Sequence, residues 1–174
     1  ILYGGGALLA RELTVRWGGS WPTLLALGAA YGLVEEGLVV GSLFNPAWEG
    51  LYGMAAYGRW LGINWVWAVH QTIFHTLFSV GSPALLAWLM FPARRSARWL
   101  GRRALRALAA AWMVNNFLLF ARFLLLTAYR PPAIDHLLTL TLIAALGWGA
   151  RRLPAPERPA SPRLRPAFWF GLVG

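Results

Sequence analysis

Residues 31–42, with the sequence YGLVEEGLVVGS, place two adjacent glutamates inside an apolar run. The run from Pro22 to Phe44 is 23 residues long, and Glu35 and Glu36 are its only charged residues. A run of this length is sufficient for a transmembrane helix. An acidic side chain near the bilayer centre costs about 2.5 to 3.5 kcal/mol on the translocon-insertion scale. The two glutamates therefore need polar partners inside the protein, and they are the candidate functional site.

The composition is that of an integral membrane protein. Hydrophobic residues make up 58% of the chain and charged residues only 13%, whereas a soluble domain carries about 25% charged residues. Apolar runs recur along the whole sequence, so we predict an all-α, polytopic integral membrane helical bundle. The absence of cysteine excludes disulfides, thiolate catalysis and cysteine-ligated metals.

The apolar runs predict four complete transmembrane helices plus two partial terminal ones. We expect the complete helices at residues 22–44, 65–91, 107–129 and 133–150, and the partial ones at residues 1–10 and from residue 168. Residues 1–150 would form the bundle, residues 151–166 a Pro/Arg-rich linker, and residues 167–174 the start of a further helix. Both ends of the sequence lie in apolar runs, so we expect the chain to be an internal part of a longer protein.

The distribution of arginine predicts the orientation. The loops at residues 11–21, 92–106 and 151–166 hold two, six and five arginines, against only Arg59 and Arg130 on the other side. Arginine-rich loops face the cytoplasm, which places the protein in the inner membrane of a bacterial cell. The net charge of +10 is then explained by topology and by contact with anionic lipid headgroups, and we predict no nucleic-acid partner.

Residues 45–64 form the longest loop that is not rich in arginine. Its aromatic residues and scattered glycines predict an amphipathic segment that lies in the membrane interface. The alternative is a re-entrant lid over the glutamates.

Polar residues in two later helices are candidate partners for the glutamates. With a rise of ~1.5 Å per residue, Glu35 and Glu36 lie ~12 to 14 Å below the outer end of their helix. Polar residues of the later helices lie at similar levels in the outer half of the membrane, so we expect them to face the glutamates inside the bundle. The candidates are His70, His75, Asn115, Asn116 and Arg122.

The glycines before the glutamates predict a close helix contact. Gly28, Gly32 and Glu36 follow one another at intervals of four and share a helix face. Small residues spaced in this way let a neighbouring helix approach closely. Glu36 is therefore expected to point at a tightly packed neighbour, with Glu35 on the adjoining face.

Three interpretations of this cluster stay open at the level of the sequence. In the first, Arg122 forms a structural ion pair with Glu35 or Glu36, which would fix helix packing without catalysis. In the second, a buried glutamate acts as general base for a water molecule beside His75 or His70. The third is a metal site, but His70 and His75 are five residues apart, whereas the HExxH motif places its histidines four apart on one face. We therefore predict no metal site, and the sequence identifies no cofactor.

The order of these residues resembles the CAAX-protease and bacteriocin-processing family of intramembrane glutamic proteases. That family carries a Glu-Glu pair followed by arginine, a histidine preceded by phenylalanine, and a later helix with asparagine. Glu35 and Glu36 match the first motif, His70 or His75 the second, and Asn115 or Asn116 the third. The resemblance implies that glutamate and histidine activate water while asparagine stabilises the oxyanion. The flanking positions differ, because the expected arginine is Val40.

The predicted function follows from this cluster. We expect a multi-pass membrane protein that is a divergent intramembrane protease-like enzyme. The alternative is a non-catalytic accessory subunit of a larger membrane complex that handles pigment, haem or lipid, in contact with other membrane helices. A proton-coupled transporter is the third option, since buried carboxylates can carry protons.

Overall fold

The computed structural model describes residues 1–154. Most of the predicted linker at residues 151–166, and the predicted start of a helix at residues 167–174, lie outside the described residues. Arg151 and Arg152 belong to the last helix rather than to the linker.

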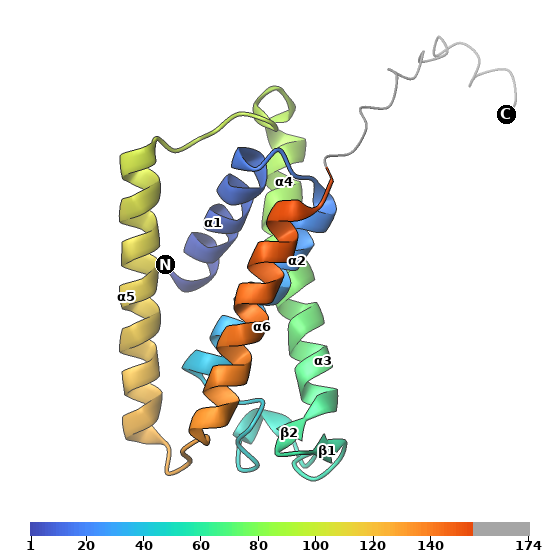
Figure 1. The fold of residues 1–174 in the computed structure, drawn as a ribbon, viewed down its shortest axis with the longest axis vertical. Coiled ribbons are helices and arrows are strands. Elements are labelled where there is room, and N and C mark those ends of the chain that lie inside the picture. Colours follow the sequence, from blue (N-terminus) through green and yellow to red (C-terminus); the bar gives the residue numbers. More distant parts are fainter. Residues whose placement is uncertain (155–174) are drawn as a thin grey trace, which may run out of the picture.

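The described chain is almost entirely helical (Figure 1). Its elements, in chain order, are α1 (Leu2–Arg16), α2 (Trp21–Gly32), the π-helical segment η1 (Leu33–Val39), the 3-10 turn η2 (Glu49–Leu51), β1 (Arg59–Trp60), β2 (Ile63–Asn64), α3 (Trp65–Phe74), the π-helical segment η3 (His75–Gly81), α4 (Ser82–Met90), the 3-10 turn η4 (Pro92–Arg94), α5 (Arg102–Leu126) and α6 (Ala133–Arg152). α3, η3 and α4 form one continuous helix from Trp65 to Met90.

Three helices of the described region are long and apolar enough to cross a membrane: Trp65–Met90, Arg102–Leu126 and Ala133–Arg152. Large apolar side chains such as Phe78, Phe117 and Leu125 are exposed on them, as expected for surfaces that face lipid. A membrane protein built of helices is thus confirmed, whereas the number of complete spans is not.

The helix that carries the glutamates is shorter than predicted. α2 and η1 together end at Val39, not at Phe44. The chain turns at Gly41, whose φ of +70° suits glycine. The N–H groups of Phe44 and Asn45 both donate to the Gly41 carbonyl, which closes the turn.

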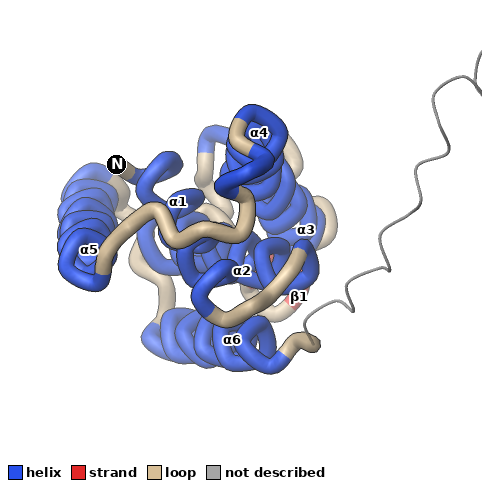
Figure 2. The backbone as a smooth tube through the Cα atoms, turned by 90° about the horizontal axis from the view of Figure 1, so that it is seen from above, coloured by secondary structure: helices blue, strands red, loops and turns tan. Residues whose placement is uncertain are grey.

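α2 occupies the centre of the bundle, between α1, α6 and the long helix of η3 and α4 (Figure 2). Its glycines allow the close contact that the sequence predicts. A Cβ on Gly28 would lie 3.0 Å from Cα of Thr76, and one on Gly32 would lie 3.1 Å from Cβ of His75. The core around α2 contains Leu24, Leu27 and Tyr31 of this helix, with Val80, Ala84 and Trp88 of the facing helix.

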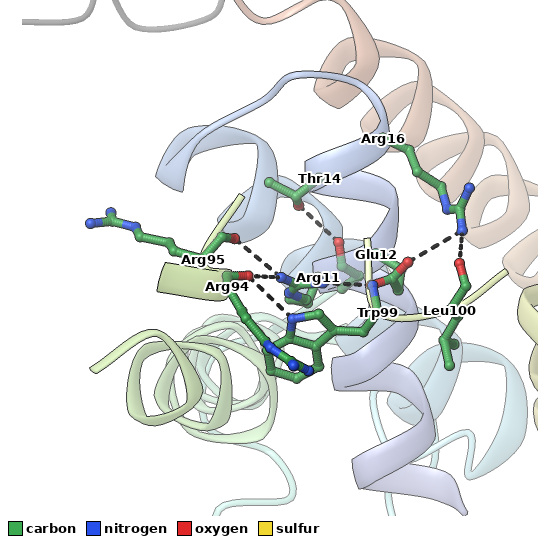
Figure 3. Close-up of polar contacts among 9 residues, drawn as sticks. Arg11, Glu12, Thr14, Arg16, Arg94, Arg95, Trp99 and Leu100 are labelled. Carbon is green, nitrogen blue, oxygen red and sulfur yellow. Dashed lines mark hydrogen bonds and ion pairs between the residues drawn. The ribbon is translucent and has the colours of Figure 1, made fainter. Parts of the chain in front are cut away.

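The first helix extends past its predicted end. Residues 11–16 were expected in a loop, but α1 continues to Arg16. Arg11 and Glu12 are 2% and 0% exposed and form an ion pair of 2.5 Å. Glu12 also accepts a hydrogen bond from Arg16 and one from the Trp99 backbone N–H (Figure 3). Through these contacts the charged side chains of Arg11 and Glu12 are buried within the protein.

The same cluster holds the loop after α4. Arg11 donates to the carbonyls of Arg94 and Arg95, and its guanidinium lies 3.9 Å from the centre of the Trp99 ring. Arg16 donates to the Leu100 carbonyl. Figure 3 shows both arginines reaching from α1 to this loop. The cluster therefore joins the start of the bundle to the segment that precedes α5.

Residues 45–64 contain no amphipathic helix. They form the turn η2 and a two-stranded antiparallel pairing in which Trp60 lies opposite Ile63. Asn64, which is fully buried, organises this segment. Its side-chain amide donates to the Met54 carbonyl, and its side-chain oxygen accepts from the Trp67 N–H and caps α3.

Candidate functional site

Two π-helical segments carry the central polar residues. Glu35 and Glu36 lie in η1, and His75 begins η3. The bond from the Val40 N–H to the Glu35 carbonyl, at 2.8 Å, spans five residues instead of four. Such segments are rare and occur frequently at functional sites. Here the wider turns bring side chains of the two helices toward one another.

Glycines within these segments permit tight packing. A Cβ on Gly37 would lie 2.7 Å from Cγ2 of Thr139 in α6, and one on Gly81 would lie 2.9 Å from the Thr76 carbonyl oxygen. Any other residue would push the neighbouring atoms away. The local geometry of both π segments therefore depends on positions that lack a side chain.

Glu36 and His75 form the central pair. Oε1 of Glu36 lies 3.0 Å from Nε2 of His75, and both residues are buried. The Gln71 side chain donates to the same glutamate oxygen at 2.9 Å. The Ser42 hydroxyl donates to Oε2 of Glu36 and accepts from the Trp67 indole N–H. Glu36 is thus held by three side chains.

The other face of His75 meets a second acid. Nδ1 of His75 lies 2.9 Å from the Ser79 hydroxyl and 3.6 Å from Oε2 of Glu35. That Glu35 oxygen is buried and has no hydrogen-bond partner in the described region. One imidazole therefore lies between two carboxylates, of which one is fully bonded and the other has a free oxygen.

Two tyrosines enclose the imidazole. The Tyr3 ring stacks on His75 with ring centres 6.3 Å apart, and the Tyr31 ring meets it edge-on at 5.6 Å. Tyr31 is buried, and its hydroxyl has no hydrogen-bond partner in residues 1–154. The cluster thus contains a second polar atom that is available for a further ligand.

The charges of the central cluster are not balanced. Within residues 1–154 the only ion pairs of Glu35 and Glu36 are with His75. Two ionised carboxylates in an interior of low dielectric repel each other, and a histidine supplies one positive charge at most. The cluster therefore holds more acidic than basic groups.

In the Arg11–Glu12–Arg16 cluster, by contrast, the buried acid is fully paired. Both oxygens of Glu12 are bonded, and two arginines surround the one acid (Figure 3). A buried charge with such partners needs no further ligand. This cluster therefore has a structural role, and the Glu35–Glu36–His75 cluster is the candidate functional site.

His70 lies outside the centre. It is exposed and stacks on Trp67 and Phe74. Its Nδ1 lies 3.0 Å from Oε1 of Gln71, the residue that donates to Glu36. His70 is therefore an indirect neighbour of the cluster.

The predicted residues of α5 do not join the cluster. Asn116 is buried, but its amide donates to the Trp112 carbonyl of its own helix, and neither Asn115 nor Asn116 has a hydrogen bond to Glu35, Glu36 or His75 in the described structure. The first of the three interpretations, an ion pair of Arg122 with Glu35 or Glu36, is not found among the described residues. The Arg122 side chain is exposed on α5 and forms no ion pair within residues 1–154.

The sequence prediction named Glu36 and His75, but its candidates do not include Gln71, Ser79 and Ser42, which support the pair. Gln71, His75 and Ser79 follow at intervals of four, which places them on one helix face. This spacing was the available signal. Ser42 follows the end of η1, and the turn at Gly41 places its hydroxyl against Glu36.

An apolar groove of about 490 Å³ lies between α1, α2, α5 and α6. Tyr31 and Trp112, whose ring centres are 6.0 Å apart, both line it, and Arg106 lines it on α5. Because Tyr31 also contacts His75, its side chain separates the groove from the cluster and lines both.

The chain matches the model of a family described as an uncharacterized membrane protein family, over residues 1–167. The chain belongs to this family. No curated protein and no solved structure matches it. The match supports a location in the membrane, and the resemblance to CAAX proteases is not confirmed.

Proposed function

We propose that this member of the family is a protease-like hydrolase that activates water at the Glu35–Glu36–His75 cluster. The observation that carries the proposal is the free Oε2 of Glu35, buried 3.6 Å from an imidazole that a second carboxylate holds in place. A carboxylate beside histidine is a standard combination for general acid–base chemistry.

Each residue takes a role that fits its contacts. Glu35 accepts a proton from water, since Glu36 already accepts from Gln71 and Ser42. His75, whose ring Glu36 and Ser79 hold, donates the Nδ1 proton to the leaving group, and Glu35, 3.6 Å from Nδ1, then returns to that nitrogen the proton that it took from water. The unpartnered Tyr31 hydroxyl donates to the developing oxyanion, which is the role that the resemblance implies for asparagine.

The groove beside Tyr31 indicates the substrate. Its lining is mostly aliphatic and aromatic, with Leu9, Leu13, Val34, Met113 and Ile143 among the residues. A hydrolase in this position would receive an apolar segment laterally from the bilayer, either a peptide helix or a lipid-modified chain.

The membrane placement follows the arginine rule. The segment Trp21–Val39 would be a fourth, short span, and the end of the bundle that holds Arg11 and Arg16 would face the cytoplasm. Glu35 and Glu36, three or four residues before the end of η1, would then lie ~5 to 6 Å below the opposite surface. Arginines of residues 92–106 would contact anionic headgroups of the inner leaflet.

The test uses full-length protein in lipid nanodiscs with a panel of fluorogenic single-span peptides. We expect cleavage by the wild type and a loss of at least about 100-fold in Glu35→Gln and His75→Asn. Glu49→Gln is the matched control, since Glu49 is exposed in the loop after η1. Equal rates in wild type and Glu35→Gln would refute the proposal.

A non-catalytic role as a subunit of a larger complex is the second candidate. It is favoured by α5, in which Asn116 is the only buried residue and Arg122 is exposed on an apolar helix. A partner helix with an acidic residue would cover this face. Gentle solubilisation followed by mass spectrometry of the intact assembly would detect such a partner, and a monomer would argue against it.

A further inference from the structure

The central cluster has the ligands of a metal site. Glu35, Glu36 and His75 each offer one ligand atom, and these atoms all lie within 4.8 Å of one another. All three residues are buried. We infer that Glu35, Glu36 and His75 bind one divalent transition-metal ion, although the sequence spacing predicts no metal site.

Distances around His75 support a common ion. With metal–ligand bonds of about 2.0 to 2.1 Å, neighbouring ligands of a tetrahedral zinc ion lie about 3.3 Å apart. Oε1 of Glu36 lies 3.0 Å from Nε2 of His75, and Oε2 of Glu35 lies 3.6 Å from Nδ1. The ligand atoms of the three residues lie within 4.8 Å of one another, and an ion on the Nε2 side requires the Glu35 carboxylate to turn from Nδ1 toward Nε2.

The surrounding contacts are those that orient metal ligands. A ligating histidine nearly always donates its second ring N–H to an oxygen, and here the Ser79 hydroxyl lies 2.9 Å from Nδ1. Nε2 is then left with its lone pair directed at Glu36. Gln71 and Ser42 hold the Glu36 carboxylate in turn, so the first ligand pair is already oriented.

Two buried polar atoms without a hydrogen bond also favour a further ligand in the cluster. Oε2 of Glu35 and the Tyr31 hydroxyl are buried without hydrogen-bond partners in the described chain. A cation would bind the glutamate oxygen, and a water or hydroxide on that cation would accept from Tyr31. Both atoms would then be satisfied.

Charge and ligand type select the ion. Two carboxylates and a neutral imidazole carry two negative charges, which one divalent cation neutralises. An imidazole with two carboxylates suits Zn²⁺ and related ions, whereas Mg²⁺ and Ca²⁺ prefer oxygen ligands alone. The inference deepens the proposed function, since a zinc-bound water is activated near neutral pH. In that state the ion, not Glu35, activates the water.

The test measures the binding of Zn²⁺ to the protein without any substrate. Tag-free full-length protein is treated with EDTA, dialysed, and titrated with Zn²⁺, with bound metal quantified by mass spectrometry and thermal unfolding followed in parallel. We expect one Zn²⁺ per chain, a higher melting temperature with Zn²⁺, and no such effect of Mg²⁺. Glu35→Gln, Glu36→Gln and His75→Asn should lose the site.

Further variants show whether the bound Zn²⁺ occupies this cluster. Ser79→Ala, which leaves all three ligands in place, should weaken Zn²⁺ binding about 10- to 100-fold. His136→Asn and Glu49→Gln, which lie outside the cluster, should bind as the wild type does. Absence of Zn²⁺ binding by folded wild type, or equal binding by the ligand variants, would overturn the inference. Peptide cleavage that persists in EDTA without zinc would leave the proposed function standing and remove only the metal.

Discussion

His75, the first residue of η3, and Glu36, the central residue of η1, are 39 residues apart in the chain and meet at 3.0 Å. The contact is possible because Gly32, one turn before Glu36, leaves the space that the Cβ of His75 approaches. The polar pair therefore depends on the apolar packing of α2 against η3. This dependence gives a direct stability test.

Gly28→Ala should destabilise the protein by about 1 to 3 kcal/mol, because the new Cβ would lie 3.0 Å from the Thr76 backbone and overpack the interface. Thermal or denaturant unfolding in detergent measures the change. Gly147→Ala in α6 is the control, since nothing lies within 4 Å of its Cβ position. There the substitution should be neutral or stabilise the helix by about 0.5 to 1 kcal/mol. The same effect at both positions would contradict the packing argument.

Much of this interface could be predicted from the sequence. Glu35 and Glu36 in an apolar run, the glycines at Gly28 and Gly32, and a histidine in the next long helix indicated a close polar contact, and the structure has it. The π turns could not be predicted, because helix phase was calculated at 3.6 residues per turn. The end of the helix at Val39, after which Ser42 turns back to bond Glu36, was not predicted either.

The charged residues were harder to predict for a different reason. A charge next to an apolar run is compatible with a solvated loop or a buried pair, and only tertiary contacts separate these cases. Arg11 and Glu12 were expected in a loop but are buried. Arg122 was expected in a buried pair but is exposed. The depth of the glutamates was overestimated, because their helix ends at Val39 and not at Phe44, and the exposed position of Arg122 on α5 was not predicted.

Glu12→Gln should destabilise the protein by about 3 to 5 kcal/mol, because it leaves the buried Arg11 without its charged partner. It should also release the loop of residues 94–100, which Arg11 and Trp99 attach to α1 (Figure 3). Limited proteolysis of this loop, together with thermal unfolding, measures both effects. Glu49→Gln, at an exposed position, is the control and should change neither the melting temperature nor the rate of proteolysis. A Glu12→Gln protein that is as stable as the wild type and keeps the loop protected would refute the structural role of Glu12.

Arg122→Leu should change stability by no more than about 0.5 kcal/mol, because the side chain is exposed and unpaired among the described residues. A buried ion pair with Glu35 or Glu36 would instead cost about 3 to 5 kcal/mol when broken. Unfolding of the isolated chain in detergent distinguishes an exposed, unpaired Arg122 from one in a buried ion pair. If α5 binds a partner helix through Arg122, the variant should lose the partner while its own melting temperature stays unchanged.

Tyr31→Phe removes a single hydroxyl group, and its effects on stability and on catalysis should differ. The Tyr31 hydroxyl is buried without a partner, and removal of an unsatisfied polar group costs no hydrogen bond, so the free energy of unfolding should stay the same or rise. If the hydroxyl donates to an oxyanion, the same substitution should lower kcat by about 10²- to 10³-fold. Tyr57→Phe, which changes an exposed tyrosine, is the control for both measurements. Unfolding and peptide cleavage are measured on the same preparation. A destabilised Tyr31→Phe protein would mean that the hydroxyl is hydrogen-bonded within the fold. An unchanged kcat would mean that Tyr31 takes no part in the reaction. The roles of Glu35 and His75 would then be tested by their own variants.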